Sequence, residues 1–411
     1  MKTKLLSFQR FSQQLLPHEA RYLSQIQAFH DVENQQIIQK LLLKATEPSQ
    51  HVQFDESIDK RKYSRIKKWV QEKLNAIDVD QEFEWINHME QQIMTDGISP
   101  EEEKELLGRL QKYHEPAYYF MKLYELALHY RQFLLVRMRH KAHEEVQCFI
   151  EKQQARYELS KFTYEKLHQA TLDITRQYIE YNTESRQWEA WLQEVFSNEQ
   201  LDGLNRFYAS VRLAFMYLNY RRFDKLAGLF EEQDTLLNKG LFYSRRILLN
   251  YYSNRLLLHS KVGELEKAAY YGYLSIRQRN VDFLLYLNNL SAVLLRQGKS
   301  EEALKLMEEA RGEVKIAPSG HSKVIYSAHY VRCLIDAGRI EDAQRYAERF
   351  LRGYKEDVLT QRWHTFFSAY FKSLLLQEKY ETILKGASRY KLAAKERKYQ
   401  GKSDYLPTLS W

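Results

Sequence analysis

Two copies of the tripeptide Gly-Lys-Ser are the first candidates for chemistry, because this tripeptide ends the phosphate-binding loop of many nucleotide-binding proteins. The copies occupy residues 298–300 and 401–403. Such a loop also needs a glycine five residues before the first of these residues, so that backbone amides can surround the phosphates. The chain has Val293 and Glu396 at those places, which argues against a phosphate loop in either copy.

A pair of histidines on a predicted helix could bind a metal ion. His140 and His143 are one helical turn apart, and Glu144 follows them directly. This spacing can present two imidazole nitrogens to a cation. Arg139 directly precedes the pair and Lys141 lies between the two histidines. Their positive charge opposes a cation, so a solvated basic face is the favoured interpretation.

Other catalytic patterns are incomplete. A single Glu-x-x-His motif spans residues 165–168, whereas a carboxylate-bridged di-iron bundle needs two. No Gly-x-Ser-x-Gly elbow is present, and neither Cys148 nor Cys333 lies in a protease signature. Two distant cysteines are typical of buried thiols in a reducing compartment. We therefore expect no enzyme activity, no cofactor and no metal site.

Two clusters of basic residues could hold phosphates or an acidic partner. Residues 60–68 contain six lysines or arginines, and residues 385–398 contain six more. The alternative is a solvated helix face that also offsets helix-end dipoles. The aromatic residues between these cations follow core spacing, so stacking on nucleic-acid bases is not indicated.

Composition favours long helices in an aqueous compartment. The 411 residues include only 14 glycines and 6 prolines, which are the residues that interrupt helices. The 62 lysines and arginines nearly balance 54 acids, which is weak support for a nucleic-acid partner. No apolar run approaches the roughly 18 residues of a membrane helix, and residues 1–17 lack the apolar centre of a secretory signal. We expect no membrane association and a cytoplasmic location.

A short pattern recurs at a fixed spacing. Gly298-Lys-Ser-Glu-Glu-Ala303 returns as Gly338-Arg-Ile-Glu-Asp-Ala343, 40 residues later, and residues 263–268 carry a related pattern 35 residues before the first. Each glycine closes one amphipathic segment, and each alanine lies inside the next. The pattern predicts one helical hairpin used many times, and hence an all-α fold arranged as an α-solenoid of antiparallel helix hairpins.

The segments around these turns resemble the tetratricopeptide repeat over about residues 205–395. The packing positions before the glycine turns are Leu287, Leu290, Ser291 and Leu294, then Tyr330, Val331 and Leu334. Those after the turns are Ala303, Met307 and Ala310, then Ala343, Ala347 and Phe350. Two further units fit with turns at Arg221 and Glu378. In the unit of Gly263, Arg255 and His259 replace apolar residues, which suggests a first helix offset by one.

The resemblance implies a site for a peptide or protein. In this family the first helices of successive hairpins line a concave groove, and some members clamp a peptide carboxylate there with ordered Lys, Asn and Arg residues. That order is not reproduced here. The positions that the resemblance places in the groove hold Arg212, Phe215, Asn289, Ala292, Arg296, His329, Arg332 and Lys372.

The chain is predicted to have three parts: an N-terminal helical module at 1–115, degenerate helical repeats at 116–200 and tetratricopeptide-like repeats at 201–411. No Pro-, Gly- or Ser-rich linker separates them, so one continuous solenoid is expected. The clearest helix start is Ser99-Pro100-Glu101-Glu102, where Ser99 and Glu102 can form a capping box. Near the C-terminus, Tyr405, Leu406, Leu409 and Trp411 are expected to cover the last hairpin or to meet a partner or second copy.

The leading functional prediction is a scaffold or adaptor that binds a peptide or protein in the groove. The first alternative is a solenoid that binds nucleic acid or phosphate through residues 60–68 and 385–398. The second is a peptide-sensing regulator with the N-terminal module as its output, although residues 1–115 contain no convincing helix-turn-helix signature.

Overall fold

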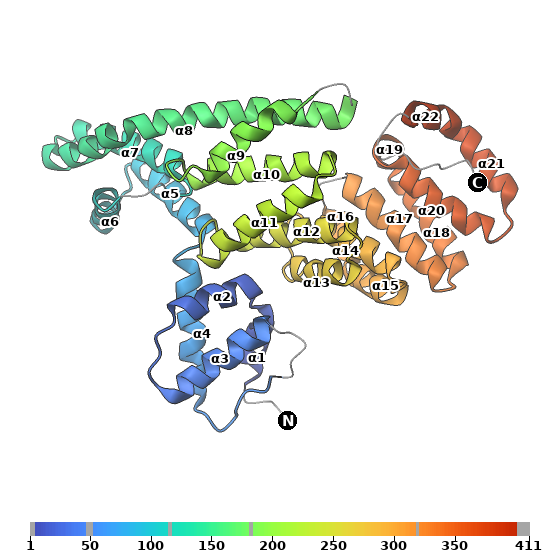
Figure 1. Ribbon diagram of the computed structural model, residues 1–411, viewed down its shortest axis with the longest axis horizontal. Helices are drawn as coiled ribbons and strands as arrows, with labels where there is room; N and C mark the ends of the chain where they lie inside the picture. The colour runs from blue at the N-terminus through green and yellow to red at the C-terminus, as the bar shows by residue number, and fades with distance from the viewer. Residues whose placement is uncertain (1–4, 47–51, 114–116, 181–183, 318–319, 401–411) are drawn as a thin grey trace. The chain divides into compact units, whose positions relative to one another are not determined.

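The computed structural model describes residues 5–46, 52–113, 117–180, 184–317 and 320–400, and every regular element within these ranges is a helix (Figure 1). The prediction of an all-helical chain is confirmed, as the scarcity of glycine and proline indicated. Contacts between residues divide the chain into two compact units, Met1–Ile247 and Leu248–Trp411. The expected division near residues 115 and 200 stays a prediction.

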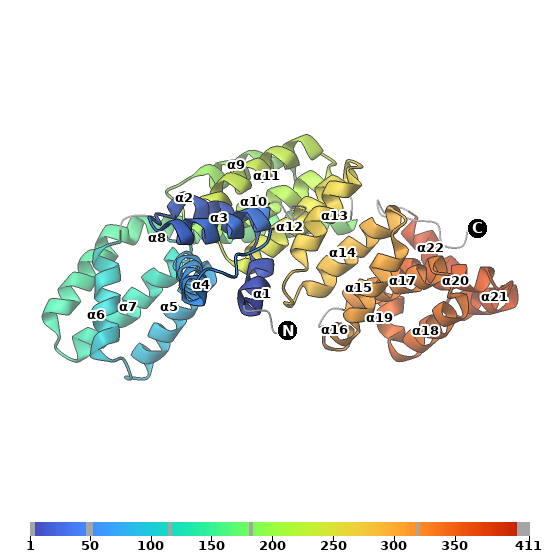
Figure 2. The ribbon, with the colours of Figure 1, turned by 90° about the horizontal axis from the view of Figure 1, so that it is seen from below.

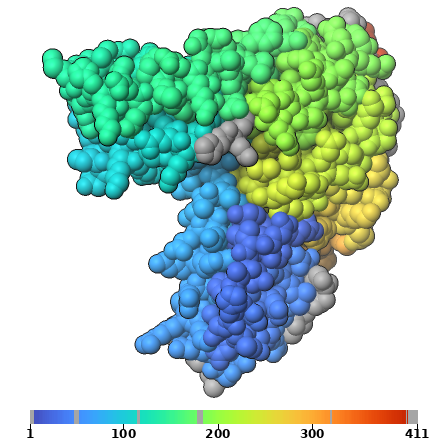
Figure 3. Space-filling model, turned by 60° about the vertical axis from the view of Figure 1, so that its left-hand side comes forward, coloured from blue at the N-terminus to red at the C-terminus, as the bar shows by residue number. Residues whose placement is uncertain are grey.

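The first unit begins with four helices that pack on one another. These are α1 (Leu6–Gln14), α2 (Pro17–Ile26), α3 (Val32–Thr46) and α4 (Lys60–Asn75). The helices that follow are α5 (Val79–Met94), α6 (Pro100–Gln111), α7 (Phe120–Val136), α8 (His140–Glu180), η1 (Arg186–Trp188), α9 (Glu189–Ser197), α10 (Gly203–Asn219) and α11 (Phe223–Asn238). Figure 3 shows α1–α4 in blue at one end of this unit and α8 in green along the opposite edge.

Apolar side chains of α5–α8 form one core of the first unit. Tyr130 and Phe120 of α7 are fully buried there, between α5 on one side and α8 on the other. Helix α10 packs against α8, α9 and α11, and α11 packs against α2. The chain therefore returns to its N-terminal helices about 200 residues after leaving them.

A buried ionic network joins these distant segments. The carboxylate of Glu19, at the start of α2, is fully buried. It accepts hydrogen bonds from the Tyr243 hydroxyl at 2.6 Å and from Arg245 Nε at 2.8 Å. Next to it, His18 Nε2 lies 2.7 Å from a carboxylate oxygen of Asp234 on α11. Removing one partner of such a network leaves a buried charge uncompensated, which is strongly destabilising.

The second unit contains the helices after α12 (Arg245–Lys261), which itself begins in the first unit. They are α13 (Leu265–Ser275), α14 (Phe283–Arg296), α15 (Ser300–Glu309), α16 (Arg311–Ile316), α17 (Gly320–Asp336), α18 (Ile340–Gly353), α19 (Lys355–Thr360), α20 (Trp363–Leu375), α21 (Tyr380–Arg389) and α22 (Leu392–Tyr399). Helix α14 packs against α15 and α17, and α17 packs in the same way against α18 and α20 (Figure 2).

Contacts in the second unit repeat with the spacing of the sequence pattern. Ala303 and Ala343 are fully buried in the core, as the pattern predicted. The Tyr330 hydroxyl lies 3.3 Å from a carboxylate oxygen of Glu308. Forty residues later, the Tyr370 hydroxyl lies 3.4 Å from the equivalent oxygen of Glu348. A tyrosine of one hairpin thus contacts the second helix of the hairpin before it.

Seven pairs of consecutive helices in the described ranges are joined by the same backbone turn, which also ends α11 at Gly240. In each turn a residue has positive φ, and the amide of the next residue donates to the carbonyl five positions before it. This is the hydrogen bond of a Schellman helix cap. The residues with positive φ are Asp96, Met138, Arg221, Gly263, Gly298, Gly338 and Glu378. The turns expected at the last five positions are confirmed, including the two without glycine.

The seven turns join consecutive helices into hairpins. The hairpins are α5/α6, α7/α8, α10/α11, α12/α13, α14/α15, α17/α18 and α20/α21. The predicted capping box at the start of α6 is also confirmed, because Ser99 accepts from the amide of Glu102 and Glu102 accepts from the amide of Ser99. The C-terminal segment of Tyr405, Leu406, Leu409 and Trp411, and the tripeptide at 401–403, lie outside the described residues.

Candidate functional site

Apart from Ala292, seven residues were predicted to contact a peptide in the groove. Five of these seven lie on the first helices of the second unit. Asn289 and Arg296 are on α14, His329 and Arg332 on α17, and Lys372 on α20. Residues three, four or seven apart share one side of a helix, and these positions are exposed or half-buried. We call this surface the first-helix face. Its residues are Asn289, Ala292, Arg296, Ile325, His329, Arg332, Asp336, Thr365, Ser368 and Lys372.

The remaining two predicted residues, Arg212 and Phe215, belong to α10 of the first unit. Arg212 Nε donates to the Thr171 hydroxyl at 2.7 Å, and Nη1 donates to the carbonyl of Tyr208 at 2.9 Å. Burial lowers the pKa of this guanidinium. Arg212 therefore holds α10 against α8 within the first unit, whereas the other five belong to the second unit.

Polar contacts with a separation of 36 residues link α12 to α14 and α17 to α20. Asn289 Nδ2 donates to the Ser253 hydroxyl of α12 at 3.1 Å. Arg296 Nη1 donates to the hydroxyl of Ser260 at 2.7 Å and to its carbonyl at 2.9 Å. Lys372 Nζ lies 4.0 Å from a carboxylate oxygen of Asp336. These contacts fix the positions of the side chains on the first-helix face.

His329 is a neutral group at the centre of this face. Its Nδ1 is 2.9 Å from the Ser291 hydroxyl of α14. Packing around the ring and, secondarily, the charge of Arg332 lower the pKa of His329 to about 4. At neutral pH the imidazole can therefore hydrogen-bond a ligand without adding a charge.

Charge is distributed unequally between the two helices of each hairpin. Helices α14, α17 and α20 contain four lysines or arginines and one acid, Asp336. Helices α15, α18 and α21 contain eight acids and six lysines or arginines. The guanidinium of Arg332 is exposed and makes no hydrogen bond or ion pair among the described residues. The first-helix face is therefore suited to a negatively charged partner.

The two basic clusters are partly neutralised by their surroundings. In the cluster at 60–68, Lys62 Nζ lies 2.8 Å from carboxylate oxygens of both Asp31 and Glu33. In the cluster at 385–398, Lys385 pairs with Glu381 at 3.0 Å, and Lys395 Nζ donates to a backbone carbonyl. Neither cluster forms a continuous cationic surface through its whole length, and nucleic-acid binding stays an alternative without structural support.

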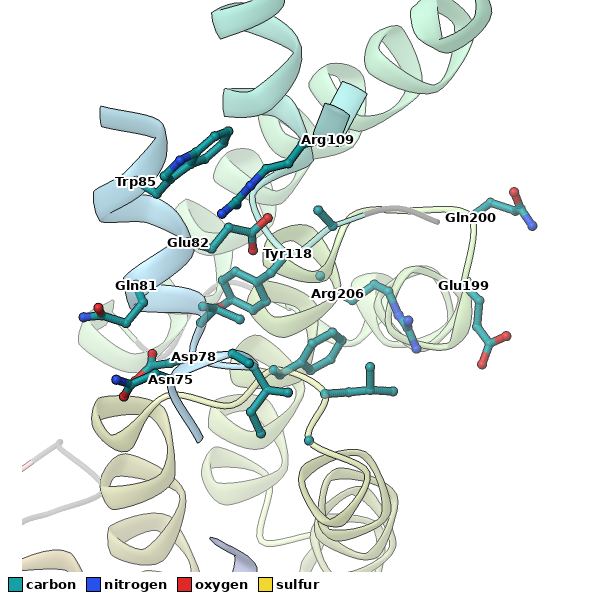
Figure 4. A pocket seen from close by; sticks show the side chains of 18 of the residues that line it. Asn75, Asp78, Gln81, Glu82, Trp85, Arg109, Tyr118, Glu199, Gln200 and Arg206 are labelled. Carbon is teal, nitrogen blue, oxygen red and sulfur yellow. The ribbon is translucent and has the colours of Figure 1, made fainter. Parts of the chain in front are cut away.

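A cavity of about 730 Å³ lies in the first unit (Figure 4). Its walls come from the α4–α5 connection, α5, α6, α8, the beginning of α10 and the segment before α12. Sequence reasoning missed it, because its residues extend from position 75 to position 242 without a local motif. The charged residues of its lining are Asp78, Glu82, Arg109, Arg156, Glu199 and Arg206.

Two further searches concern metals and membranes. No group of three His, Cys, Asp or Glu side chains that could hold a metal ion occurs in the part of the chain that the structure describes. None of the helices in the described ranges combines the length and the apolar character that crossing a bilayer requires.

Comparisons of the chain with protein-family models, with curated proteins and with solved structures find no match. The residues and their geometry are therefore the basis of the functional argument.

Proposed function

We propose that the hairpins form an α-solenoid with tetratricopeptide-like repeats, and that the protein is a scaffold or adaptor without enzyme activity. The recurring Schellman turns, the 36-residue polar contacts and the repeated tyrosine–glutamate contact support this arrangement. Each of them links one hairpin to itself or to its neighbour. Stacked units of this kind present one extended surface along their first helices.

The proposed partner is an acidic peptide segment of another protein, bound along the first-helix face. The observation that carries this proposal is the near absence of acids from α14, α17 and α20. Arg296 is held by Ser260 through one terminal nitrogen, and Arg332 makes no hydrogen bond or ion pair with any residue that the structure describes. Guanidinium groups bind carboxylates with charge-assisted hydrogen bonds, so these two arginines are the expected contacts for glutamate or aspartate.

Asn289 and His329 supply the neutral part of recognition. Asn289 donates one amide hydrogen to Ser253, which leaves its carbonyl oxygen and second amide hydrogen for a partner. An extended peptide exposes unpaired backbone amides and carbonyls, and side-chain amides and imidazoles can bind both.

Fluorescence titration tests the proposal. A labelled glutamate-rich peptide and a matched peptide with glutamine in place of glutamate are each titrated with the full chain. We expect tighter binding of the glutamate peptide. The double change Arg296→Glu and Arg332→Glu should weaken it roughly tenfold or more, because each charge-assisted hydrogen bond contributes about 1.5–3 kcal/mol. Helicity and melting should change little, because exposed charges add little stability.

The matched control is the double change Arg349→Glu and Arg352→Glu. These residues are exposed on α18, a second helix of the same unit, and their reversal alters net charge equally. If the control weakens binding as much as the first-helix variant, attraction is non-specific. If neither variant weakens binding, the first-helix face is not the site. A steep loss of oligonucleotide binding with added salt would instead favour the nucleic-acid alternative.

A further inference from the structure

The cavity in the first unit contains three arginines, one each from α6, α8 and α10. Among the described residues, none of the three forms an ion pair with a carboxylate of the lining. Arg109 pairs with Glu105, one turn earlier on its own helix, at 2.8 Å. Arg206 Nε donates to the carbonyl of Phe196 at 2.9 Å, and burial lowers the pKa of its guanidinium. A half-buried cation without an anion partner is costly.

Aromatic rings hold two of these arginines in place. The guanidinium carbon of Arg109 lies 3.7 Å from the centre of the Trp85 ring, and Figure 4 shows the two side chains together. The guanidinium carbon of Arg206 lies 5.2 Å from the ring centre of Phe242. A guanidinium over a ring face keeps the N–H groups in its own plane available. The rings therefore restrict both cations while leaving hydrogen-bond donors for a ligand.

A third donor lines the same cavity without an acceptor. Trp85 Nε1 is buried and has no hydrogen-bond partner among the described residues. Leaving such a group unpaired costs about 1–3 kcal/mol. The Trp85 indole thus contributes an apolar face to Arg109 and an unsatisfied N–H, which an oxygen atom of a ligand could accept.

The acids of the cavity do not cancel this excess of donors. Asp78 caps α5, with its carboxylate accepting the amide of Asp80 at 2.9 Å. Glu82 has no ion pair within 4 Å among the described residues, and burial raises its pKa even though Arg109 opposes the shift. Figure 4 shows the Glu82 side chain directed toward Arg109. The third acid, Glu199, is exposed at the edge of the lining, makes no ion pair within 4 Å among the described residues, and its charge partly opposes the effect of burial on the pKa of Arg206.

We propose that this cavity binds a small organic molecule that carries a phosphate or carboxylate group. Arg109, with the Trp85 N–H beside it, and Arg206 come from different parts of the cavity (Figure 4), and each would bind oxygen atoms of the molecule, since arginine forks match both kinds of oxyanion. The volume of about 730 Å³ exceeds that of a bare inorganic ion and lies within the usual range of ligand pockets, roughly 300–1,000 Å³. This site is independent of the peptide site proposed above.

Isothermal titration calorimetry of the full chain with inorganic pyrophosphate and, separately, with citrate tests the proposal. We expect saturable binding of at least one probe. Binding of pyrophosphate alone assigns a phosphate group, and binding of citrate alone assigns a carboxylate. Arg206→Met should weaken the bound probe roughly ten- to a hundredfold, because charged hydrogen bonds are lost. Arg10→Met, an exposed change on α1 of the same unit, should leave affinity within twofold.

Two results would overturn the proposal: no saturable binding of either probe, or equal loss of affinity in Arg206→Met and Arg10→Met. Circular dichroism melting checks that each variant folds. If Arg206→Met does not fold, Arg109→Gln replaces it, and the same loss of affinity is expected.

The variant Glu82→Gln tests the charge of the ligand, because anionic and cationic ligands should respond with opposite changes in affinity. Removing this carboxylate takes away repulsion of an anion, so the affinity for the bound probe should rise severalfold. A cationic ligand would lose an attraction in the same variant. A fall in probe affinity would therefore contradict an oxyanion site, whereas a rise supports it independently of the arginine variants.

Discussion

The two units differ in how far apart along the sequence their contacting residues lie. In the second unit, each hairpin contacts the next through residues that are 22 or 36 positions apart, such as Tyr330 with Glu308. In the first unit, Glu19 is bound by Tyr243 and Arg245, more than 200 positions later. The second unit is therefore assembled from contacts between consecutive hairpins. The first unit requires contact between its N-terminal helices and its last residues.

The chemistry of these contacts differs as well. The repeated contacts of the second unit are mainly apolar, with buried alanines where helices approach closely. The contact between the ends of the first unit includes a buried carboxylate, a guanidinium and a tyrosine hydroxyl. An apolar contact is sensitive to added volume, whereas an ionic contact is sensitive to loss of one partner. The following substitutions test this difference.

The largest effect is expected from Ala343→Arg. Ala343 is fully buried in the core of the second unit, so the new side chain overpacks the core and buries a charge. The free energy of unfolding of this unit should fall by at least about 3 kcal/mol, as measured by urea denaturation. Ala292→Arg, on the half-buried first-helix face, is the control and should cost much less. Equal losses would show that the assigned packing of α18 is wrong.

The next effect is expected from Glu19→Gln. The change removes the buried charge that Arg245 balances at 2.8 Å, and the free energy of unfolding of the first unit should fall by about 3 kcal/mol. Asp31→Asn is the matched control, because it breaks an exposed pair with Lys62 and should cost much less. Hydrogen exchange of α2 and α11 reports the loss locally. Unchanged exchange in both helices would contradict the ionic link.

A smaller, pH-dependent effect is expected from His329. Its pKa is lowered to about 4 in the folded chain, below the value of about 6.5 in an unfolded chain. Between these values the unfolded state binds a proton that the folded state does not, so stability falls as pH drops from about 6.5 to about 4. His329→Gln should reduce this slope, and His140→Gln, an exposed change, should not. Urea midpoints across this pH range give the comparison, and equal slopes in both variants would refute it.

The smallest effect concerns turn residues in both units. Glu378 and Met138 have positive φ, which costs a side chain roughly 1–2 kcal/mol. Glycine avoids this cost but loses more backbone entropy on folding, so Glu378→Gly and Met138→Gly should each raise the free energy of unfolding by up to about 1 kcal/mol. Glu381→Gly, inside α21, should lower it. Thermal melting measures all three, and destabilisation by the turn variants would argue against the left-handed geometry.

Features formed by consecutive hairpins could be predicted from the sequence, whereas features formed by distant segments could not. Gly298 and Gly338 mark their turns by residue type, and the 40-residue spacing leads from them to Glu378. The turn at Asp96 lies directly before Gly97, a residue type common at helix ends. The turn at Met138 has neither glycine nor regular spacing, since the next turn, at Arg221, is 83 residues away. A repeated turn can be recognised in the sequence only where the residue type at the turn, or the interval between turns, is kept.

The cavity could not be predicted for a related reason. Trp85 and Arg109 look like an ordinary core aromatic and an ordinary surface cation, and only the packing of α5 with its neighbours places one over the other. Arg206 becomes notable only because Phe196 and Phe242 surround it. The first-helix residues, in contrast, follow helical spacing, so five of the predicted positions fall on one face although their binding role stays a prediction.

The contact between α2 and α11 also has a consequence during protein synthesis. Ribosomes add roughly 5–20 residues per second, and His18 and Asp234 are 216 positions apart. The first four helices must therefore wait roughly 10–40 seconds before their partner helix has been made. Each hairpin of the second unit meets its neighbour after about 40 residues, within roughly 2–8 seconds. The N-terminal helices are thus the part of the nascent chain that spends longest with an exposed docking surface, and the part with most need of a chaperone.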